Sequence, residues 1–253
     1  MRATYVGTAA AMTARDLMRQ RLVLVLALAV PAIFFTSVFA TTGERPVPIT
    51  LAAGDGRVML VDERRQSLLF IGIAASALIS AFFASSLIQR QLDANRRLVL
   101  CGYRAAELIA ARLAVLLGIV AITALYTWLA LGLFSSPRFP GGVLLGLMVG
   151  AFVYGCYGLL VGTLVRRELE SIFAILVLVN IDAGWLQNPS YYQNAGSKWL
   201  IEVLPAHYPS QIAYLSAFTS DNLGGPVASG LAYGTALLLI AVALYGMRMR
   251  ITR

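Results

Sequence analysis

The sequence predicts an all-α membrane protein with six transmembrane helices. Hydrophobic residues make up 59% of the 253 residues and charged residues only 13%, whereas a soluble domain carries roughly a quarter charged residues. The hydrophobic residues also gather into runs that approach the length of about 20 residues needed for a helix to cross the bilayer. The basic residues that give the net charge of +8 lie between these runs. This arrangement indicates membrane orientation and not a nucleic-acid-binding patch.

The segment 2–21 precedes the first apolar run and has the spacing of an amphipathic helix. Val6, Ala9, Thr13 and Leu17 recur at helical intervals, and the charged residues fall elsewhere. Such a helix is expected to lie in the interface at the inner face of the membrane. The alternative, that the segment merely extends the first span, stays open at this point.

Six apolar runs follow, and with segment 2–21 they form one domain that covers residues 1–253. Each run is free of charge or nearly so, as a membrane helix requires. Pro31 in the first run is tolerated within a membrane helix, and Asp182 is the one acid well inside an apolar run. The expected spans are about 22–40, 67–88, 106–134, 141–165, 171–187 and 226–247.

An even number of spans puts both termini on one side of the membrane, and the basic residues indicate which side. If the N-terminus is cytoplasmic, 14 of the 20 lysines and arginines fall in inner segments, and the outer ones are interleaved with acids. The positive-inside rule therefore favours two cytoplasmic termini. The inner basic residues are then Arg2, Arg15, Arg19, Arg21, Arg90, Arg96, Arg97, Arg104, Arg112, Arg166, Arg167, Arg248, Arg250 and Arg253.

The inner segment 89–112 carries five arginines around a short apolar core, 98–100. Gly102 can break a helix at that point. A new helix then begins near Arg104, carries Glu107 in its first turns and continues into the third span. The segment is therefore suited either to docking a soluble partner or to lying as a basic loop near anionic lipid headgroups. The residues alone favour neither alternative.

The chain lacks the motifs of a nucleotide-hydrolysing enzyme. A phosphate-binding loop needs a Gly-rich turn that ends in Lys followed by Ser or Thr. The only lysine is Lys198, and Trp199 follows it. His207 is the only histidine and is expected to be a structural loop residue, so we also expect no metal site. The sequence therefore predicts no enzyme and no cofactor in this chain, and any ATP-driven work requires another polypeptide.

The order of these segments resembles the permease subunits of type-2 ABC transporters. In that family, a short apolar helix, a turn, and a helix with an acid and a closing basic residue lie between the second and third of six spans. The family often has a Glu/Arg-rich run and a proline in this turn, where this chain has residues 91–97 and Gly102. The residues that carry the resemblance are Leu100, Gly102, Tyr103, Arg104, Glu107, Leu108 and Arg112.

The resemblance implies the transmembrane subunit of an ABC exporter in the cytoplasmic (inner) membrane of a prokaryote. It implies a cytoplasmic coupling helix in segment 89–112, separate ABC-type ATPase subunits that hold ATP and Mg, and a second permease, identical or homologous. The implied cargo is an amphipathic drug, a lipid or a glycolipid-like molecule, and no nucleic acid is expected. The residues implied in coupling to the ATPase are Arg96, Arg97, Leu100, Gly102, Tyr103, Arg104 and Glu107.

The outer segment 187–225 is rich in tyrosine and tryptophan, which favour the membrane interface. We therefore expect it to lie on the outer leaflet or to dip into it. By resemblance, it corresponds to short outer re-entrant helices before the last span.

Asn180 and Asp182 in the fifth span are the candidate residues of a substrate path. An ionised acid at the bilayer centre costs about 2.5–3.5 kcal/mol on insertion scales, so Asp182 either faces an internal cavity or caps the end of a short helix. An ion-coupled carrier or channel is the alternative function, but it would need more ionisable groups within the spans.

The fourth span has small residues at a regular interval of four. Such a ridge lets another helix approach closely, and we interpret it as a packing surface. The ridge consists of Gly142, Gly146, Gly150, Gly158 and Gly162, with Tyr154 at the missing step.

Overall fold

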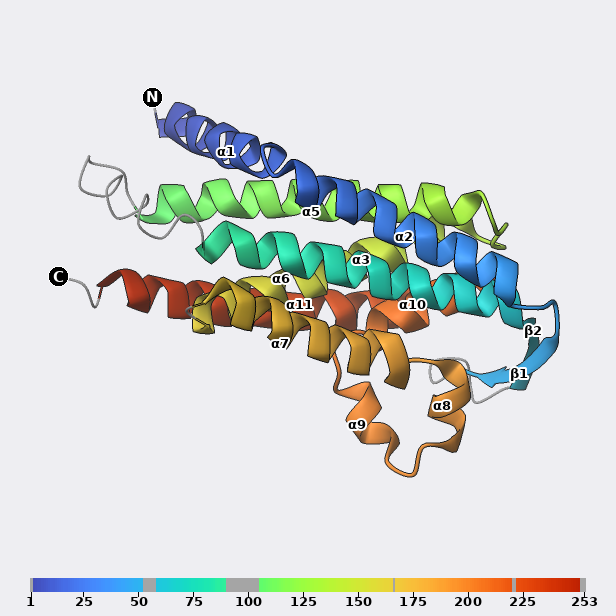
Figure 1. Cartoon of the computed structure of the whole chain (residues 1–253). Coiled ribbons are helices and arrows are strands. Elements are labelled where there is room, and N and C mark those ends of the chain that lie inside the picture. Colours follow the sequence, from blue (N-terminus) through green and yellow to red (C-terminus); the bar gives the residue numbers. More distant parts are fainter. Residues whose placement is uncertain (1, 52–57, 90–104, 166, 220–221, 251–253) are drawn as a thin grey trace.

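The computed structural model describes residues 2–51, 58–89, 105–165, 167–219 and 222–250. The chain begins with helices α1 (Arg2–Met18) and α2 (Arg21–Thr41), and from α2 onward the long helices run side by side along one axis (Figure 1). The other long helices are α3 (Glu63–Gln89), α5 (Ala105–Gly132), α6 (Pro140–Leu164), α7 (Glu168–Ile181) and α11 (Gly224–Arg250). The shorter elements are strands β1 (Pro46–Thr50) and β2 (Val58–Asp62), the π-helical turn η1 (Asp182–Leu186), and helices α8 (Pro189–Asn194), α9 (Lys198–Glu202) and α10 (His207–Phe218).

The structure confirms the predicted helical class, and five helical segments among the described residues are long and apolar enough to cross a membrane. These segments are Glu63–Gln89, Ala106–Gly132, Pro140–Leu164, Glu168–Leu186 and Gly224–Arg248. The remaining expected span, 22–40, coincides with α2, in which Ala27–Thr41 forms a shorter apolar helix. The sixth crossing therefore stays a prediction.

Helix α6 is the centre of the bundle, because α3, α5, α10 and α11 all pack against it. Its side chains Val143, Leu147, Val153 and Tyr154 are completely buried. Helix α11 and the outer face of α7 are more exposed, as expected for helices that face lipid. The core is therefore a set of helices around α6, and its outer surface is apolar.

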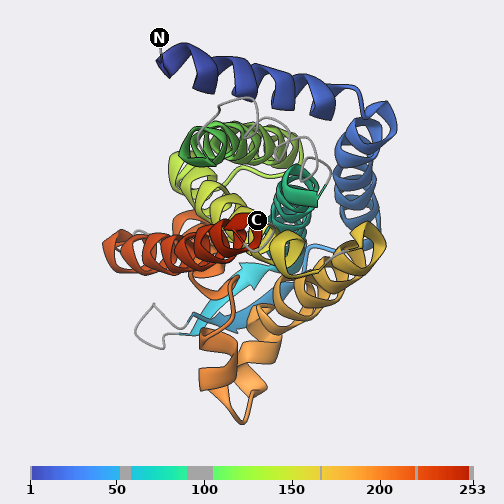
Figure 2. The ribbon, with the colours of Figure 1, turned by 90° about the vertical axis from the view of Figure 1, so that its left-hand side faces the viewer.

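Both ends of the described chain lie at the same end of the bundle (Figure 1), which we call the terminal end. Helix α1 lies across this end, whereas α2 runs along the bundle (Figure 2). The face of α1 predicted to be apolar is turned inward: Ala9, Thr13 and Leu17 are buried. Helix α1 is thus a separate amphipathic helix and not an extension of the first span.

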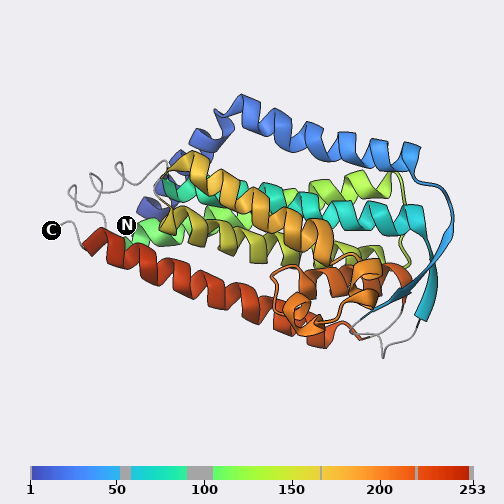
Figure 3. The same ribbon diagram turned by 60° about the horizontal axis from the view of Figure 1, so that its bottom comes forward.

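An antiparallel hairpin of β1 and β2 stands at the opposite end, which we call the hairpin end (Figures 1 and 3). Its register pairs Pro46 with Asp62 and Thr50 with Val58. Asp62 Oδ1 then accepts a hydrogen bond of 2.8 Å from the backbone N–H of Arg64 and so caps the start of α3. The sequence analysis did not predict this hairpin, which is an addition to the all-α class.

Candidate functional site

The predicted coupling region is described only in part. Six of its seven residues lie in 90–104, outside the described residues: Arg96, Arg97, Leu100, Gly102, Tyr103 and Arg104. The seventh, Glu107, is half-buried in the first turn of α5. The next residue, Leu108, is buried and packs with Ala111 against Ala9 of α1. The helix that follows the predicted coupling region therefore packs directly against α1.

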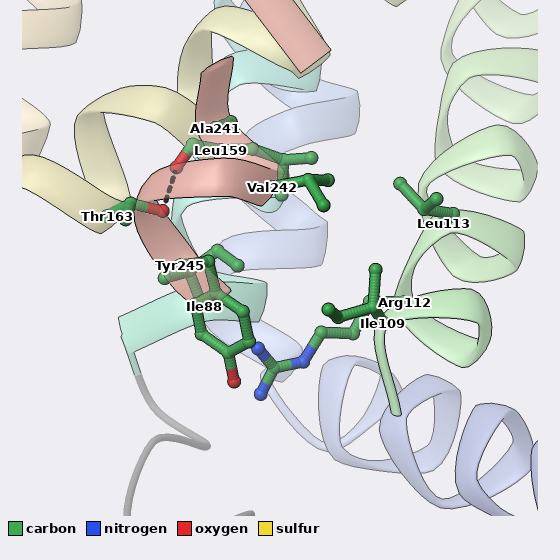
Figure 4. Close-up of a pocket in the computed structure, with 9 residues that line it drawn as sticks. All are labelled: Ile88, Ile109, Arg112, Leu113, Leu159, Thr163, Ala241, Val242 and Tyr245. Carbon is green, nitrogen blue, oxygen red and sulfur yellow. Dashed lines mark hydrogen bonds between the residues drawn. The ribbon is translucent and has the colours of Figure 1, made fainter. Parts of the chain in front are cut away.

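Arg112 closes the predicted coupling region, and its side chain is buried inside the bundle. The residue is only 4% exposed. Its guanidinium carbon lies 4.8 Å from the centre of the Tyr245 ring on α11, a distance typical of cation–π contact. The two residues line a cleft between α3, α5, α6 and α11 (Figure 4).

The glycine ridge of α6 packs against two different helices. Toward the hairpin end, Gly146 lies so close to α10 that a Cβ atom there would be 2.8 Å from the backbone nitrogen of Ala213. Toward the terminal end, Gly162 faces Ser85 of α3, where a Cβ atom would be 3.0 Å from Ser85 Cα. Gly158 likewise meets the backbone of Ala81 on α3. The ridge is thus a packing surface, as the interval predicted.

Tyr154 interrupts this ridge because its side chain reaches another helix. The residue is completely buried, and its hydroxyl donates a hydrogen bond to Oδ2 of Asp182. Asp182 stands at the junction of α7 and η1 and is also completely buried. The Tyr154 hydroxyl therefore links the middle of the central helix to the end of α7.

Two further donors satisfy the carboxylate of Asp182. The backbone N–H of Ala206, just before α10, donates to Oδ2 at 2.8 Å, and Gln187 Nε2 donates to Oδ1 at 3.0 Å. Gln187 Nε2 also donates to the carbonyl of Ile201 at 3.1 Å. We call Tyr154, Asp182, Gln187 and Ala206 the Asp182 network. Because its three donors come from α6, from the residue that follows η1 and from the loop before α10, the network holds these elements together.

Asn180 and Asp182 do not share a site. Asn180 is exposed on the outer face of α7, where its Nδ2 donates to the carbonyl of Leu176 at 2.8 Å. Asp182 is buried and is satisfied by groups of the chain itself. Of the two alternatives for Asp182, this geometry supports the structural one, at the end of a helix.

The π-helical turn η1 gives Asp182 its position. The backbone N–H of Gln187 donates to the Asp182 carbonyl at 3.1 Å, five residues back, which is the bond that defines a π-turn. The wider turn carries Gln187 back over Asp182, so both the backbone and the side chain of Gln187 contact the same residue. Turns of this type are frequent at functional sites and have no simple sequence signature.

Aromatic and charged side chains gather around α8, α9 and the start of α10. The Tyr192 hydroxyl donates to Glu202 Oε1 at 2.8 Å, and burial together with this carboxylate raises the pKa of Tyr192 to about 12. His207 is buried between the rings of Tyr192 and Tyr208, at 6.3 and 5.2 Å between ring centres. Burial lowers the pKa of His207, so this imidazole is neutral at pH 7.

No group of three or more His, Cys, Asp or Glu side chains that could hold a metal ion occurs among the described residues. Some of the buried polar groups instead contact another helix, as Tyr154 contacts Asp182 and Arg112 contacts Tyr245. Sequence reasoning missed two of these contacts, Tyr154 with Asp182 and Arg112 with Tyr245. Each left a signal, because Tyr154 breaks the glycine interval and Arg112 is a charge within an apolar helix.

Comparison of the sequence with models of known protein families finds no match, and comparison with curated proteins finds none.

Proposed function

We propose that this chain is the transmembrane subunit of an ATP-driven ABC exporter. In this proposal α2 is the first of six spans, and both termini are cytoplasmic, because most of the arginines then lie inside. The terminal end of the bundle is the cytoplasmic face. The cargo is an amphipathic drug, a lipid or a glycolipid-like molecule that leaves the cytoplasm through the inner membrane of a prokaryote.

The packing of α1 on the first turns of α5 is the observation that carries this proposal. Ala9 of α1 meets Leu108 and Ala111 of α5, directly after segment 90–104, which holds most of the predicted coupling residues. A movement imposed on that segment would reach a membrane helix and the interfacial helix at once. This is the arrangement needed to transmit work from a soluble motor into the membrane.

The motor belongs to separate ABC-type ATPase subunits, which bind ATP and Mg. A second permease, identical or homologous, completes the path. Closure of the two motors would push on the coupling helix and open the interface between the permeases to the outside. This chain itself contributes the membrane body, the coupling helix and the outer re-entrant helices α8 to α10.

The alternative function is an ion-coupled carrier or channel. Such a protein needs ionisable groups that bind and release ions within the spans. Asp182 is the acid best placed for this role, but it is completely buried and bound by three donors of the chain. The geometry therefore gives the alternative no support at this residue.

Co-purification tests the proposal. The chain is expressed from its natural host with an affinity tag, and a bound ABC-type ATPase is sought by mass spectrometry and by ATP hydrolysis. The double variant Tyr103→Ala with Arg104→Ala should lose the ATPase while still inserting into the membrane. Arg138→Ala, on the opposite side in this orientation, is the control and should keep it. Vectorial transport by the isolated chain in liposomes, without a second protein, would refute the proposal.

A further inference from the structure

Asn180 is a polar residue on a helix face that is otherwise mostly apolar. Helix α7 lies at the periphery of the bundle (Figure 2). Its buried residues Ser171, Ile175 and Val179 face inward, whereas Leu169 and Phe173 are 80% and 69% exposed. We call the exposed side of α7 and η1 the outward face, and its residues at intervals of three or four are Leu169, Phe173, Val177, Asn180 and Gly184.

Asn180 lies at the depth of the hydrocarbon when α7 crosses the membrane. The segment Glu168–Leu186 is one of those long and apolar enough to do so. Asn180 follows Glu168 by 12 residues, which corresponds to about 18 Å of helix at 1.5 Å per residue. The hydrocarbon layer is about 30 Å thick, so this amide is far from either surface. A polar group at such a depth is costly unless it is hydrogen-bonded.

The chain satisfies only part of the Asn180 amide. An asparagine has two hydrogens on Nδ2 and an acceptor at Oδ1. One hydrogen is donated to the carbonyl of Leu176 at 2.8 Å, and no further hydrogen bond reaches this amide from the described residues. The exposed hydroxyls of Thr36 and Thr235 differ, because each donates its single hydrogen to a carbonyl of its own helix, at 2.8 and 2.7 Å. Asn180 therefore retains a donor and an acceptor for a group outside this chain.

The start of the outward face carries charges of both signs. Arg167 precedes α7, and Glu170 lies in its first turn. Their side chains are 82% and 58% exposed, with Nη1 of Arg167 3.7 Å from Oε1 of Glu170. An exposed pair of this kind contributes little within one chain. A second surface with the same two residues would offer each of them another counter-charge, so the outward face is complementary to itself.

We propose that the outward face of α7 binds the same face of a second copy of this chain. Both copies cross the membrane in the same direction, so a two-fold axis along the membrane normal brings equal residues together. Asn180 then donates its remaining hydrogen to Oδ1 of the partner's Asn180 and accepts one in return. Arg167 lies beside the partner's Glu170, and Phe173 and Val177 pack across the axis.

A second copy fits this face better than lipid does. Lipid tails offer neither a donor nor an acceptor for the amide. The exposed side chains Leu117, Ile122 and Leu125 of α5 present only hydrocarbon, and we expect that face to contact lipid. The inference extends the proposed function, in which the second permease is identical or homologous, by making it identical. The homodimer itself does not depend on an ATPase.

Cysteine cross-linking in native membranes tests which face lies between the copies. Val177→Cys places a thiol on the outward face, and Ile122→Cys places one on the exposed face of α5. Both variants keep Asn180 and change an exposed apolar residue. After mild oxidation we expect Val177→Cys to give a covalent dimer on a non-reducing gel. Ile122→Cys and the unaltered chain, which accounts for the natural cysteines, should stay monomeric on the gel.

Dilution of the fluorescently labelled chain in lipid vesicles measures the dissociation constant of the dimer. Asn180→Leu should raise this constant roughly threefold to thirtyfold, which is the range for hydrogen bonds between membrane helices. Asn180→Gln keeps an amide and should dimerise more tightly than Asn180→Leu. Thr235→Val is the matched control, because Thr235 is exposed on α11 and its hydroxyl bonds its own helix. It should leave the constant unchanged.

Equal cross-linking through Val177→Cys and Ile122→Cys would overturn the proposal, and so would an unchanged dissociation constant in Asn180→Leu. A tagged chain that retains a different permease but no second, differently tagged copy would show a heterodimer instead. Neither readout needs an ATPase. A homodimer without a co-purifying ATPase would therefore count against the proposed function alone, and an ATPase bound to a chain that does not self-associate would count against this inference alone.

Discussion

Tyr154→Phe is the most informative single change, because it removes one oxygen atom from the Asp182 network and leaves the packing of the ring intact. In the unaltered chain, Asp182 accepts hydrogen bonds from the Tyr154 hydroxyl, Gln187 Nε2 and the backbone N–H of Ala206. The variant keeps the last two. It leaves one acceptor site of a fully buried carboxylate without its donor.

The expected cost follows from this geometry. A hydrogen bond to a charged group contributes about 1.5–3 kcal/mol. For a domain of this size, each kcal/mol corresponds to roughly 2–4 °C in melting temperature, so the variant should melt roughly 3–12 °C lower. Thermal unfolding of the purified chain, followed by fluorescence or by loss of the monodisperse peak on size exclusion, measures this shift.

Tyr157→Phe is the matched control on the same helix. Tyr157 is half-buried, and its ring packs edge-on against Tyr154 at 6.2 Å between centres. Removal of its hydroxyl should leave the melting temperature within about 2 °C of the unaltered chain, as for most changes away from a buried partner. Equal shifts in the two variants, or no shift in Tyr154→Phe, would refute the network as a source of stability.

The remaining predictions concern three other positions. Asp182→Asn should lower expression, melting temperature and transport in parallel, because the single amide oxygen of Asn cannot accept all three hydrogen bonds that Asp182 accepts. A loss of transport alone, with expression and melting temperature unchanged, would place Asp182 in the cargo path instead. Gly158→Ala should lower the free energy of unfolding by about 1–3 kcal/mol, because its Cβ atom would overpack against Ala81. Gly118→Ala is the control and should leave stability unchanged, because its Cβ atom would meet open space. Thermal melting of both variants measures the difference. Burial lowers the pKa of His207, so the unfolded chain binds more protons than the folded chain below about pH 6.5 and stability falls with acidification. The unaltered chain should therefore lose more melting temperature between about pH 7.5 and pH 5.5 than His207→Gln, and equal losses would exclude His207 as the cause.

Hydrophobic run length predicted the long helices well, because crossing a bilayer requires a fixed number of apolar residues. The glycine interval of α6 likewise predicted a packing surface, since residues four apart lie on one face of a helix. The inward face of α1, with Ala9, Thr13 and Leu17, follows from the same periodicity. These features depend only on residues close together in the sequence.

The partners of the buried polar residues did not follow from the sequence. Tyr154 and Asp182 are 28 residues apart, and Asp182 and Ala206 are 24 apart, so no local pattern joins them. The sequence analysis left two roles open for Asp182, and it grouped Asp182 with Asn180 because they are neighbours in the chain. The π-turn at Asp182–Leu186 separates their environments, and propensity does not predict such a turn.

The sequence by itself determined a set of long apolar helices that could cross a membrane, the approximate position of these helices and the distribution of charge between them. Only the tertiary structure decided that α10 and α3 share the glycine ridge of α6, that a hairpin precedes α3, and that Arg112 points into a cleft beside Tyr245. The physical reason is that membrane insertion depends on composition and length along the chain. The contacts between helices depend on how their surfaces fit, and those surfaces meet only after folding.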